Sequence, residues 1–114
     1  MKQINKTISN TELHQMAEKM YGNLVKAVVD VEKNILVVDA EMHADEEQYL
    51  LQNGSLQQNL WGINLYPGNF GKDSFVEFDS MINIRPCAKN FNRGIDNKDI
   101  REKIFKIVKD KIVE

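Results

Sequence analysis

The chain is poor in the residues that cross-link or bind structural metals: it has one cysteine and two histidines among its 114 residues. Because Cys87 has no second thiol to pair with, an internal disulfide is excluded, and one thiol with two histidines argues against a structural zinc site. Long apolar runs are absent as well. Met1–Thr7 is largely polar and has no apolar signal region, so we expect a cytoplasmic protein without a membrane span.

An excess of charge of one sign is also missing. The formal net charge is -2, with 28% charged and 42% apolar residues, which is ordinary for a globular protein. This composition excludes a disordered acidic chain and a collagen-like repeat, and it argues against nucleic acid as a partner. The length predicts a single globular domain over residues 1–114.

The charges are nevertheless unevenly placed. Asp30–Glu47 holds seven acids and only one base, Lys33, whereas the predicted C-terminal helix is rich in lysine. Alternating lysines and acids in that helix are typical of a solvated face. The opposite charge of the two segments leaves a homo-oligomer open as an arrangement of this chain.

Apolar spacing predicts three helices. Leu13, Ala17 and Met20 recur on one helical face, and Ser9 with Glu12 forms a capping-box pair before them. Helices are predicted over residues 10–21, over 44–52 and from Asp96 toward the C-terminus, where Asp99 lies across the cap from Asp96.

Alternating apolar residues predict the strands. Leu24–Ala40 is rich in β-branched residues and is divided by a polar turn at Asn34, which indicates a hairpin with a central first strand. Trp61–Tyr66 predicts another strand. Phe75–Arg85 has the most regular alternation in the chain and ends at Pro86, which cannot donate to a ladder.

The resulting order, with a short first strand within Lys2–Ile8, is (β)αββαββα. Strands in hairpin pairs with helices between them predict an α+β fold. We expect an antiparallel sheet of four or five strands and three helices, with the helices on one face of the sheet.

The two C-terminal strands place polar residues on one side. Matching their apolar series pairs Leu65 with Val76, Ile63 with Phe78, Trp61 with Ser80, Asn64 with Glu77 and Gly62 with Asp79. The candidate ligand-binding residues on this surface are Asn64, Tyr66, Glu77, Asp79, Asn83 and Arg85. Two carboxylates at this spacing suit general acid–base chemistry or a hard cation such as Mg²⁺.

The same pattern is also typical of a solvated sheet face. Gly62, Phe75 and Met81 are expected on that face, however, and a purely solvated face has no need of a glycine beside an acid or of two large apolar groups. These residues favour a partly covered groove or a subunit interface.

A second candidate patch lies at a strand-to-helix junction. It contains His43, Asp45, Glu46 and Glu47. His43 and Glu47 are four residues apart, so on a helix they could converge on one metal or one proton. In the alternative interpretation the three acids stabilise the positive end of the helix dipole and His43 is exposed or capping.

Several runs of the chain resemble a family of small prokaryotic proteins known only as a domain of unknown function. The resemblance rests on Val25–Glu32, His43–Glu47, Leu60–Pro67, Glu77–Pro86 and Arg93–Asp96. It implies a soluble intracellular protein and brings no activity, cofactor or site residue with it.

Two functional hypotheses follow. The first is a ligand- or protein-binding module that uses the polar surface of the two C-terminal strands. The second is a small hydrolase-like enzyme with a carboxylate site at Glu77 and Asp79, with or without a divalent metal, assisted by His43 and by Arg85 or Arg93. No nucleophile elbow, phosphate loop or metalloprotease motif is present, so neither a reaction nor a cofactor is predicted.

Overall fold

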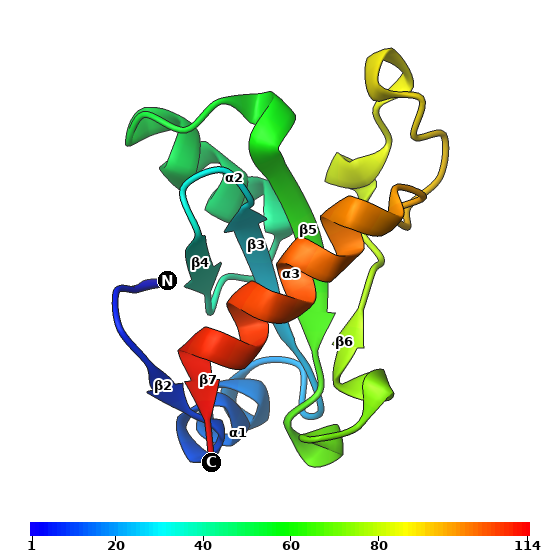
Figure 1. Ribbon diagram of the computed structural model, residues 1–114. Coiled ribbons are helices and arrows are strands. Elements are labelled where there is room, and N and C mark those ends of the chain that lie inside the picture. The colour runs from blue at the N-terminus through cyan, green and yellow to red at the C-terminus, as the bar shows by residue number, and fades with distance from the viewer.

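A computed structural model describes all 114 residues and shows an α+β fold with a five-stranded antiparallel sheet, as predicted. The strands lie in the order β1-β4-β3-β5-β6 (Figure 1). Their bounds are Lys2–Ile4 for β1, Val25–Asp30 for β3, Ile35–Val38 for β4, Leu60–Leu65 for β5 and Val76–Glu77 for β6. A separate parallel pair, β2 (Ile8–Ser9) with β7 (Ile112–Val113), joins the two ends of the chain.

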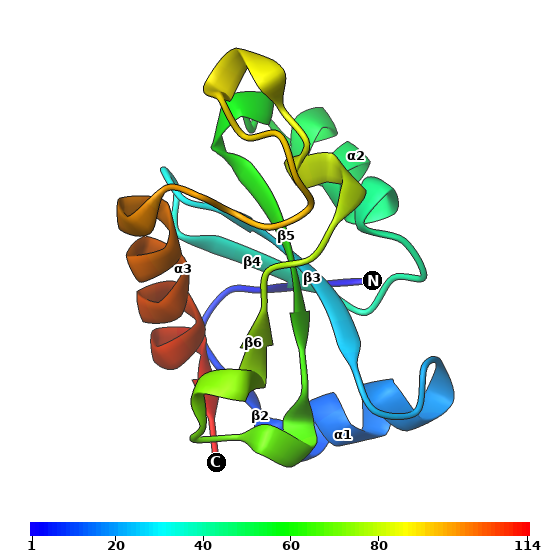
Figure 2. The same ribbon diagram turned by 90° about the vertical axis from the view of Figure 1, so that its right-hand side faces the viewer.

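Three helices surround the sheet: α1 (Asn10–Lys19), α2 (His43–Gln52) and α3 (Lys98–Lys111). Figure 2 shows α3 and α2 on opposite sides of the sheet, with α1 at the end where β2 and β7 lie. None of the helices combines the length and the apolar composition that a membrane span requires.

Helices cover both faces of the sheet, so the prediction of helices on one face only is wrong. Val25, Ala27 and Val29 of β3 belong to a core of 19 buried residues that includes α1 and α3. Val28, between them in sequence, packs with Leu50 of α2 in a second core of four residues. Since β3 is central and carries apolar residues on both sides, each face of it can bury a helix.

The hairpin predicted within Leu24–Ala40 is confirmed as β3 and β4. In its register Ala27 pairs with Val38 and Asp30 pairs with Ile35. Its turn contains Asn34 at φ 57°, the left-handed conformation that asparagine tolerates. Asp30 holds the turn, because its Oδ1 accepts hydrogen bonds from the backbone N–H groups of Glu32 and Lys33 at 3.0 and 2.9 Å.

The helix starts are partly as predicted. Ser9 caps α1 by accepting from the backbone N–H of Glu12 at 3.1 Å, but the Glu12 carboxylate pairs with Lys2 at 3.3 Å rather than closing the capping box. The cap of α3 is Asn97, which accepts from the N–H of Ile100 at 3.1 Å. The cap therefore lies one residue after Asp96, the position predicted for it.

The strand predicted over Phe75–Arg85 is wrong beyond Glu77. Only Val76 and Glu77 pair with β5, in the predicted register Leu65–Val76 and Asn64–Glu77. Phe75 closes a short 3₁₀ turn and is buried in the larger core, instead of lying on the polar side of the sheet. Met81–Asn83 forms another 3₁₀ turn, so the predicted pairs Ile63–Phe78, Gly62–Asp79 and Trp61–Ser80 do not form.

The side chain of Asn83 takes the place of the missing strand. The Gly62 N–H donates to Asn83 Oδ1 at 2.8 Å, and Asn83 Nδ2 donates to the Gly62 carbonyl at 2.9 Å and to that of Arg93 at 3.0 Å. The carboxamide satisfies both backbone groups as a neighbouring peptide unit would. A Cβ on Gly62 would lie 2.6 Å from Ser80 Cβ, so Ser80 can occupy this position only because residue 62 is glycine.

Candidate functional site

The polar face, defined here as the surface formed by Asn64, Tyr66, Glu77 and Asp79, lies on the α2 side of β5 and β6. Glu77 Oε1 accepts two hydrogen bonds, from Asn64 Nδ2 at 2.9 Å and from the Tyr66 hydroxyl at 2.8 Å. Burial and the bond to Glu77 raise the pKa of the Tyr66 phenol. The second carboxylate oxygen of Glu77 has no protein partner and faces an exposed surface.

The orientation of the Asn64 amide follows from its neighbours. Its Nδ2 contacts the Glu77 carboxylate and, at 3.4 Å, the Asp79 carbonyl, and both of these groups accept hydrogen bonds. The nitrogen must therefore point toward them and the oxygen away. Asn64 Oδ1 is buried and has no hydrogen-bond partner, so this face contains an acceptor whose donor is missing.

Asp79 is paired with a residue from a distant loop. Its Oδ1 accepts from Arg93 Nε at 2.6 Å, and both side chains are about half exposed. The pair leaves Asp79 Oδ2 and the terminal nitrogens of Arg93 without partners. One carboxylate oxygen of Asp79 therefore stays available to a ligand.

His43 lies beside this face, so the two candidate patches of the sequence meet here. His43 Nε2 is 2.8 Å from the carbonyl oxygen of Ile63, and because a carbonyl only accepts, Nε2 carries the proton. Burial lowers the pKa of His43 below 6.5, with further influence from Lys26, Asp79 and Arg93. The ring is therefore neutral at pH 7, and its unprotonated Nδ1 is an acceptor without a protein partner.

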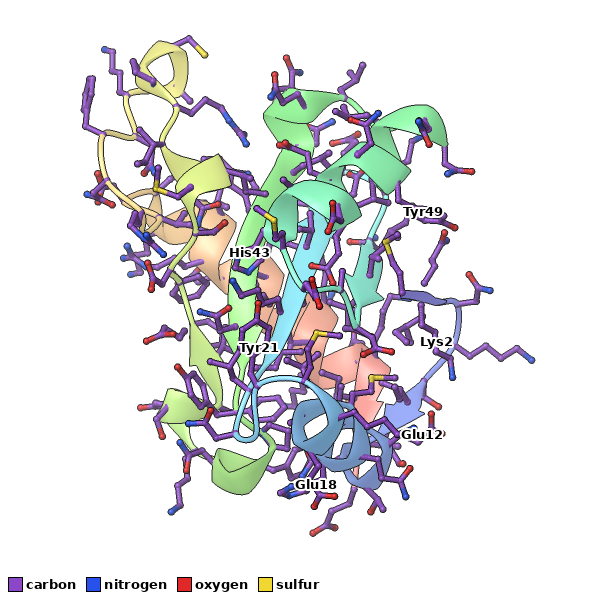
Figure 3. The ribbon with its side chains drawn as sticks, turned by 180° about the vertical axis from the view of Figure 1, so that it is seen from behind. Lys2, Glu12, Glu18, Tyr21, His43 and Tyr49 are labelled. Carbon is purple, nitrogen blue, oxygen red and sulfur yellow. The ribbon has the colours of Figure 1, made fainter.

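Lys26 brings a cation to the same side of the sheet, opposite Asn64 in the β3–β5 register. Its ammonium lies 5.0 Å from the centre of the Tyr21 ring, within cation–π range. Figure 3 shows His43 at the start of α2 and Tyr21 beyond α1 on the same side of the molecule. Lys26 is not among the site residues predicted from the sequence, although it alternates with Val28 in β3 and therefore points to the same side of the sheet.

Asn83 and Arg85 do not present their side chains on the polar face. Arg85 is only 8% exposed, and its Nη2 donates to the carbonyls of Leu60 and Ile82 at 2.7 and 3.2 Å. Its guanidinium lies 4.5 Å from the centre of the Trp61 ring, and burial lowers its pKa. Both side chains thus fix the segment after β6 against β5.

The acids of the second patch separate from one another. Glu46 has no exposed surface, neither of its carboxyl oxygens has a hydrogen-bond partner, and burial raises its pKa to about 10. It is therefore protonated at neutral pH and does not act as a charge at the helix dipole. Asp45 stays exposed in the first turn of α2, while Glu47 lies near Arg85 and opposes the lowering of its pKa.

The site is an open surface, and its side chains do not form a set of metal ligands. Tyr66 and Glu77 line a cavity of about 340 Å³ with Asn69, Ser74 and Val76, whereas His43 and Asp79 lie outside it. No three side chains of His, Cys, Asp or Glu gather closely enough to hold a metal ion. The arrangement offers acceptors and charges on a surface rather than an enclosed metal centre.

Fold and site together define a small α+β protein with a polar surface where β5, β6 and the start of α2 meet. A family model described as a protein of unknown function (DUF5674) matches residues 2–111, and the chain belongs to this family. No curated protein and no solved structure matches it significantly.

Proposed function

We propose that this protein is a binding module whose polar face receives hydrogen-bond donors from a ligand or a partner protein. The observation that supports this most directly is the set of acceptors without donors. Its members are Glu77 Oε2, Asp79 Oδ2 and His43 Nδ1. A group with several N–H or O–H donors, such as an amine, a guanidinium or a polyol, complements such a surface.

Positive charges limit which donors fit. Arg93 neutralises Asp79 from one side, and the Lys26 ammonium approaches from β3. The excess negative charge is therefore concentrated at Glu77, which we expect to bind the most strongly donating group of the partner. Met81 follows Asp79 by two residues in the chain and is 64% exposed, so a partner protein that covers Asp79 can also contact this apolar side chain.

A thermal-shift screen of the purified protein against amines, polyols, nucleotides and divalent metals tests the proposal. A ligand at a hundred times its dissociation constant adds about 2.7 kcal/mol of stability, and a shift above roughly 10 °C follows for a protein of this size. We expect the shift to disappear in Glu77→Gln and in Asp79→Asn. Glu102→Gln, an exposed acid on α3, is the matched control and keeps the shift.

A partner protein requires the second arm of the experiment. Crosslinking from residue 74, which lines the cavity with Tyr66 and Glu77, and from residue 102 on α3 compares the two surfaces in the same lysate, each residue being replaced by a photoreactive side chain. Capture from residue 74 alone of a protein whose direct binding Glu77→Gln and Asp79→Asn weaken supports the proposal. Small-molecule and protein binding that both survive these two substitutions contradict it.

One observation favours the hydrolase-like alternative: His43 is neutral, and its Nδ1 is free to take a proton beside Asp79. In that reaction class His43 would be the general base and Arg93 would hold an anionic group, while Arg85 is unavailable because it bonds backbone carbonyls. Activity on a panel of ester and phosphoester substrates that His43→Gln removes, with the melting temperature retained, would support this alternative.

A further inference from the structure

A second cavity lies on the other side of β6, between this strand, the segment 70–75 and α3. Its volume is about 460 Å³, within the range of small-molecule sites. Its apolar walls are Phe70, Phe75, Val76, Phe105, Val108 and Ile112. It shares only Val76 with the cavity at Tyr66 and shares no residue with the polar face as defined above.

Neighbouring rings hold the aromatic walls in place. Phe70 and Phe75 pack edge to face with their centres 5.3 Å apart, and Phe105 packs in the same way against Phe78 at 5.3 Å. Phe105 nevertheless remains 42% exposed, an uncommon position for a phenylalanine on a helix that already buries its other face. The walls are therefore preformed, and one of them presents an aromatic surface that no residue of the chain covers.

The outer edge of β6 adds a polar group at this cavity. The Tyr66 N–H donates to the Phe75 carbonyl at 2.9 Å, and Asn64 pairs with Glu77, so residues 75 and 77 direct their backbone groups toward β5. By the alternation of an antiparallel ladder, the N–H and C=O of Val76 point to the open side. The Val76 N–H donates to no acceptor in the preceding 3₁₀ turn or in the loops.

The charges at the rim favour an anion. Lys72 and Lys109 border the cavity and neither forms an ion pair, while Asp73 is the single acid among its lining residues. An apolar interior with two free ammonium groups and one free N–H at its edge complements a molecule with an apolar tail and one carboxylate.

We propose that this cavity binds a small amphipathic carboxylate, of the medium-chain fatty acid or arylalkanoic acid class. The tail lies between Phe75 and Phe105, and the carboxylate meets Lys72, Lys109 and the Val76 N–H. A peptide added as a further strand is a different occupant, and the structure disfavours it. β6 contains two residues, and only Val76 directs its backbone groups outward.

Titration of octanoate into the ¹⁵N-labelled protein, followed by NMR, tests this site, with octanol as a neutral probe of equal chain length. We expect saturable shifts of the amide resonances of Val76, Phe105 and Ile112, and about tenfold weaker binding of octanol. The double variant Lys72→Glu/Lys109→Glu is expected to weaken octanoate by about tenfold or more and to leave octanol nearly unchanged. Lys103→Glu, on the same helix but outside this cavity, is the matched control.

Three results would overturn the proposal. These are equal affinity for octanol and octanoate, shifts centred away from β6 and α3, and no saturable binding at millimolar octanoate. The proposal is also overturned if a valine-rich peptide shifts the resonances of β6 and octanoate does not, because the occupant of the site would then be a peptide. Because Glu77→Gln leaves this cavity intact, retained octanoate binding in that variant separates this site from the polar face.

Discussion

The two faces of the sheet are built on different principles. On the side of α1 and α3, 19 buried apolar residues form one continuous core. On the side of α2, the apolar core has four residues, and buried Asp30, His43, Glu46 and Asn64 lie around it. The first face excludes water with hydrocarbon, whereas the second depends on hydrogen bonds between side chains and backbone.

This difference shows where specific chemistry can be placed. A dry core tolerates changes of side chain as long as volume is conserved, and it offers nothing to a polar ligand. The α2 side contains groups with unsatisfied hydrogen-bonding capacity, including Asn64 Oδ1 and both oxygens of Glu46. Buried polar groups of this kind reduce stability, so their presence beside an open polar surface is consistent with selection for binding.

The largest expected loss comes from the dry face. Ile104 of α3 has no exposed surface and lies in the 19-residue core. Ile104→Ala is expected to lower the free energy of unfolding by about 4 kcal/mol, because it removes apolar contacts and leaves a cavity. Urea denaturation measures this, with Ile84→Ala at an exposed position as the control. A loss no larger than the control's would mean that this core is loosely packed.

On the α2 side, the substitution expected to cost most stability is Asn83→Ala. It leaves the N–H and C=O of Gly62 without partners, at an expected cost of about 3 kcal/mol, even though few apolar contacts are lost. Asn5→Ala, at an exposed amide, is the control for the same denaturation experiment. Because the carboxamide stands in for a strand, hydrogen exchange at Gly62 should also accelerate in the variant. An unchanged exchange rate would show that the Gly62 N–H does not depend on Asn83.

The pH dependence of stability distinguishes the faces further. The pKa of Glu46 is about 10 in the folded protein and near 4.5 when unfolded, so its contribution to stability is full below pH 4.5 and is lost as the pH rises toward 10. Between pH 7 and pH 9 the wild type should lose roughly 3 kcal/mol relative to Glu46→Gln. His43 contributes little in this interval, because its pKa is near 6.5 when unfolded and lower when folded, so the ring is mostly neutral in both states above pH 7.

Thermal denaturation across this pH range in matched buffers checks the prediction, with Glu102→Gln as a second reference. Parallel pH profiles for the wild type and Glu46→Gln would be evidence that Glu46 is not buried as a neutral acid. His43 changes the stability in the opposite direction to Glu46. Because its pKa is depressed in the folded protein, its contribution to stability is lost as the pH falls below 6.5.

The smallest expected effect concerns close packing at β5. Gly62→Ala places a Cβ 2.6 Å from Ser80 Cβ and 3.2 Å from His43 Cδ2, and should cost about 2 kcal/mol through overpacking. Ser80→Gly removes the nearer contact, so the double variant should be more stable than the sum of the two single effects predicts. Simple additivity in this double-mutant cycle would place Ser80 farther from Gly62 than the structure does.

Much of the fold could be predicted from local patterns. Three predictions are confirmed: Leu13 and Ala17 share the buried face of α1, β3 and β4 form a hairpin, and Trp61, Ile63 and Leu65 are buried on one side of β5. Periodicity reports which side of an element is apolar, and an apolar side must be buried. The same reasoning predicted the Asn64–Glu77 pair correctly, because register follows from joining two apolar series.

Other features were decided only by the tertiary structure. The alternation from Val76 to Ile84 predicts a long strand, yet pairing stops at Glu77 because Asn83 occupies the backbone groups of Gly62. His43 joins the polar face through the Ile63 carbonyl, 20 residues away, and Arg85 leaves it for the Leu60 carbonyl. A hydrogen bond between a side chain and a remote backbone group depends on distances that no local pattern contains. The sequence therefore determined the elements and their apolar faces, while the folded chain decided which polar side chains remain free to bind.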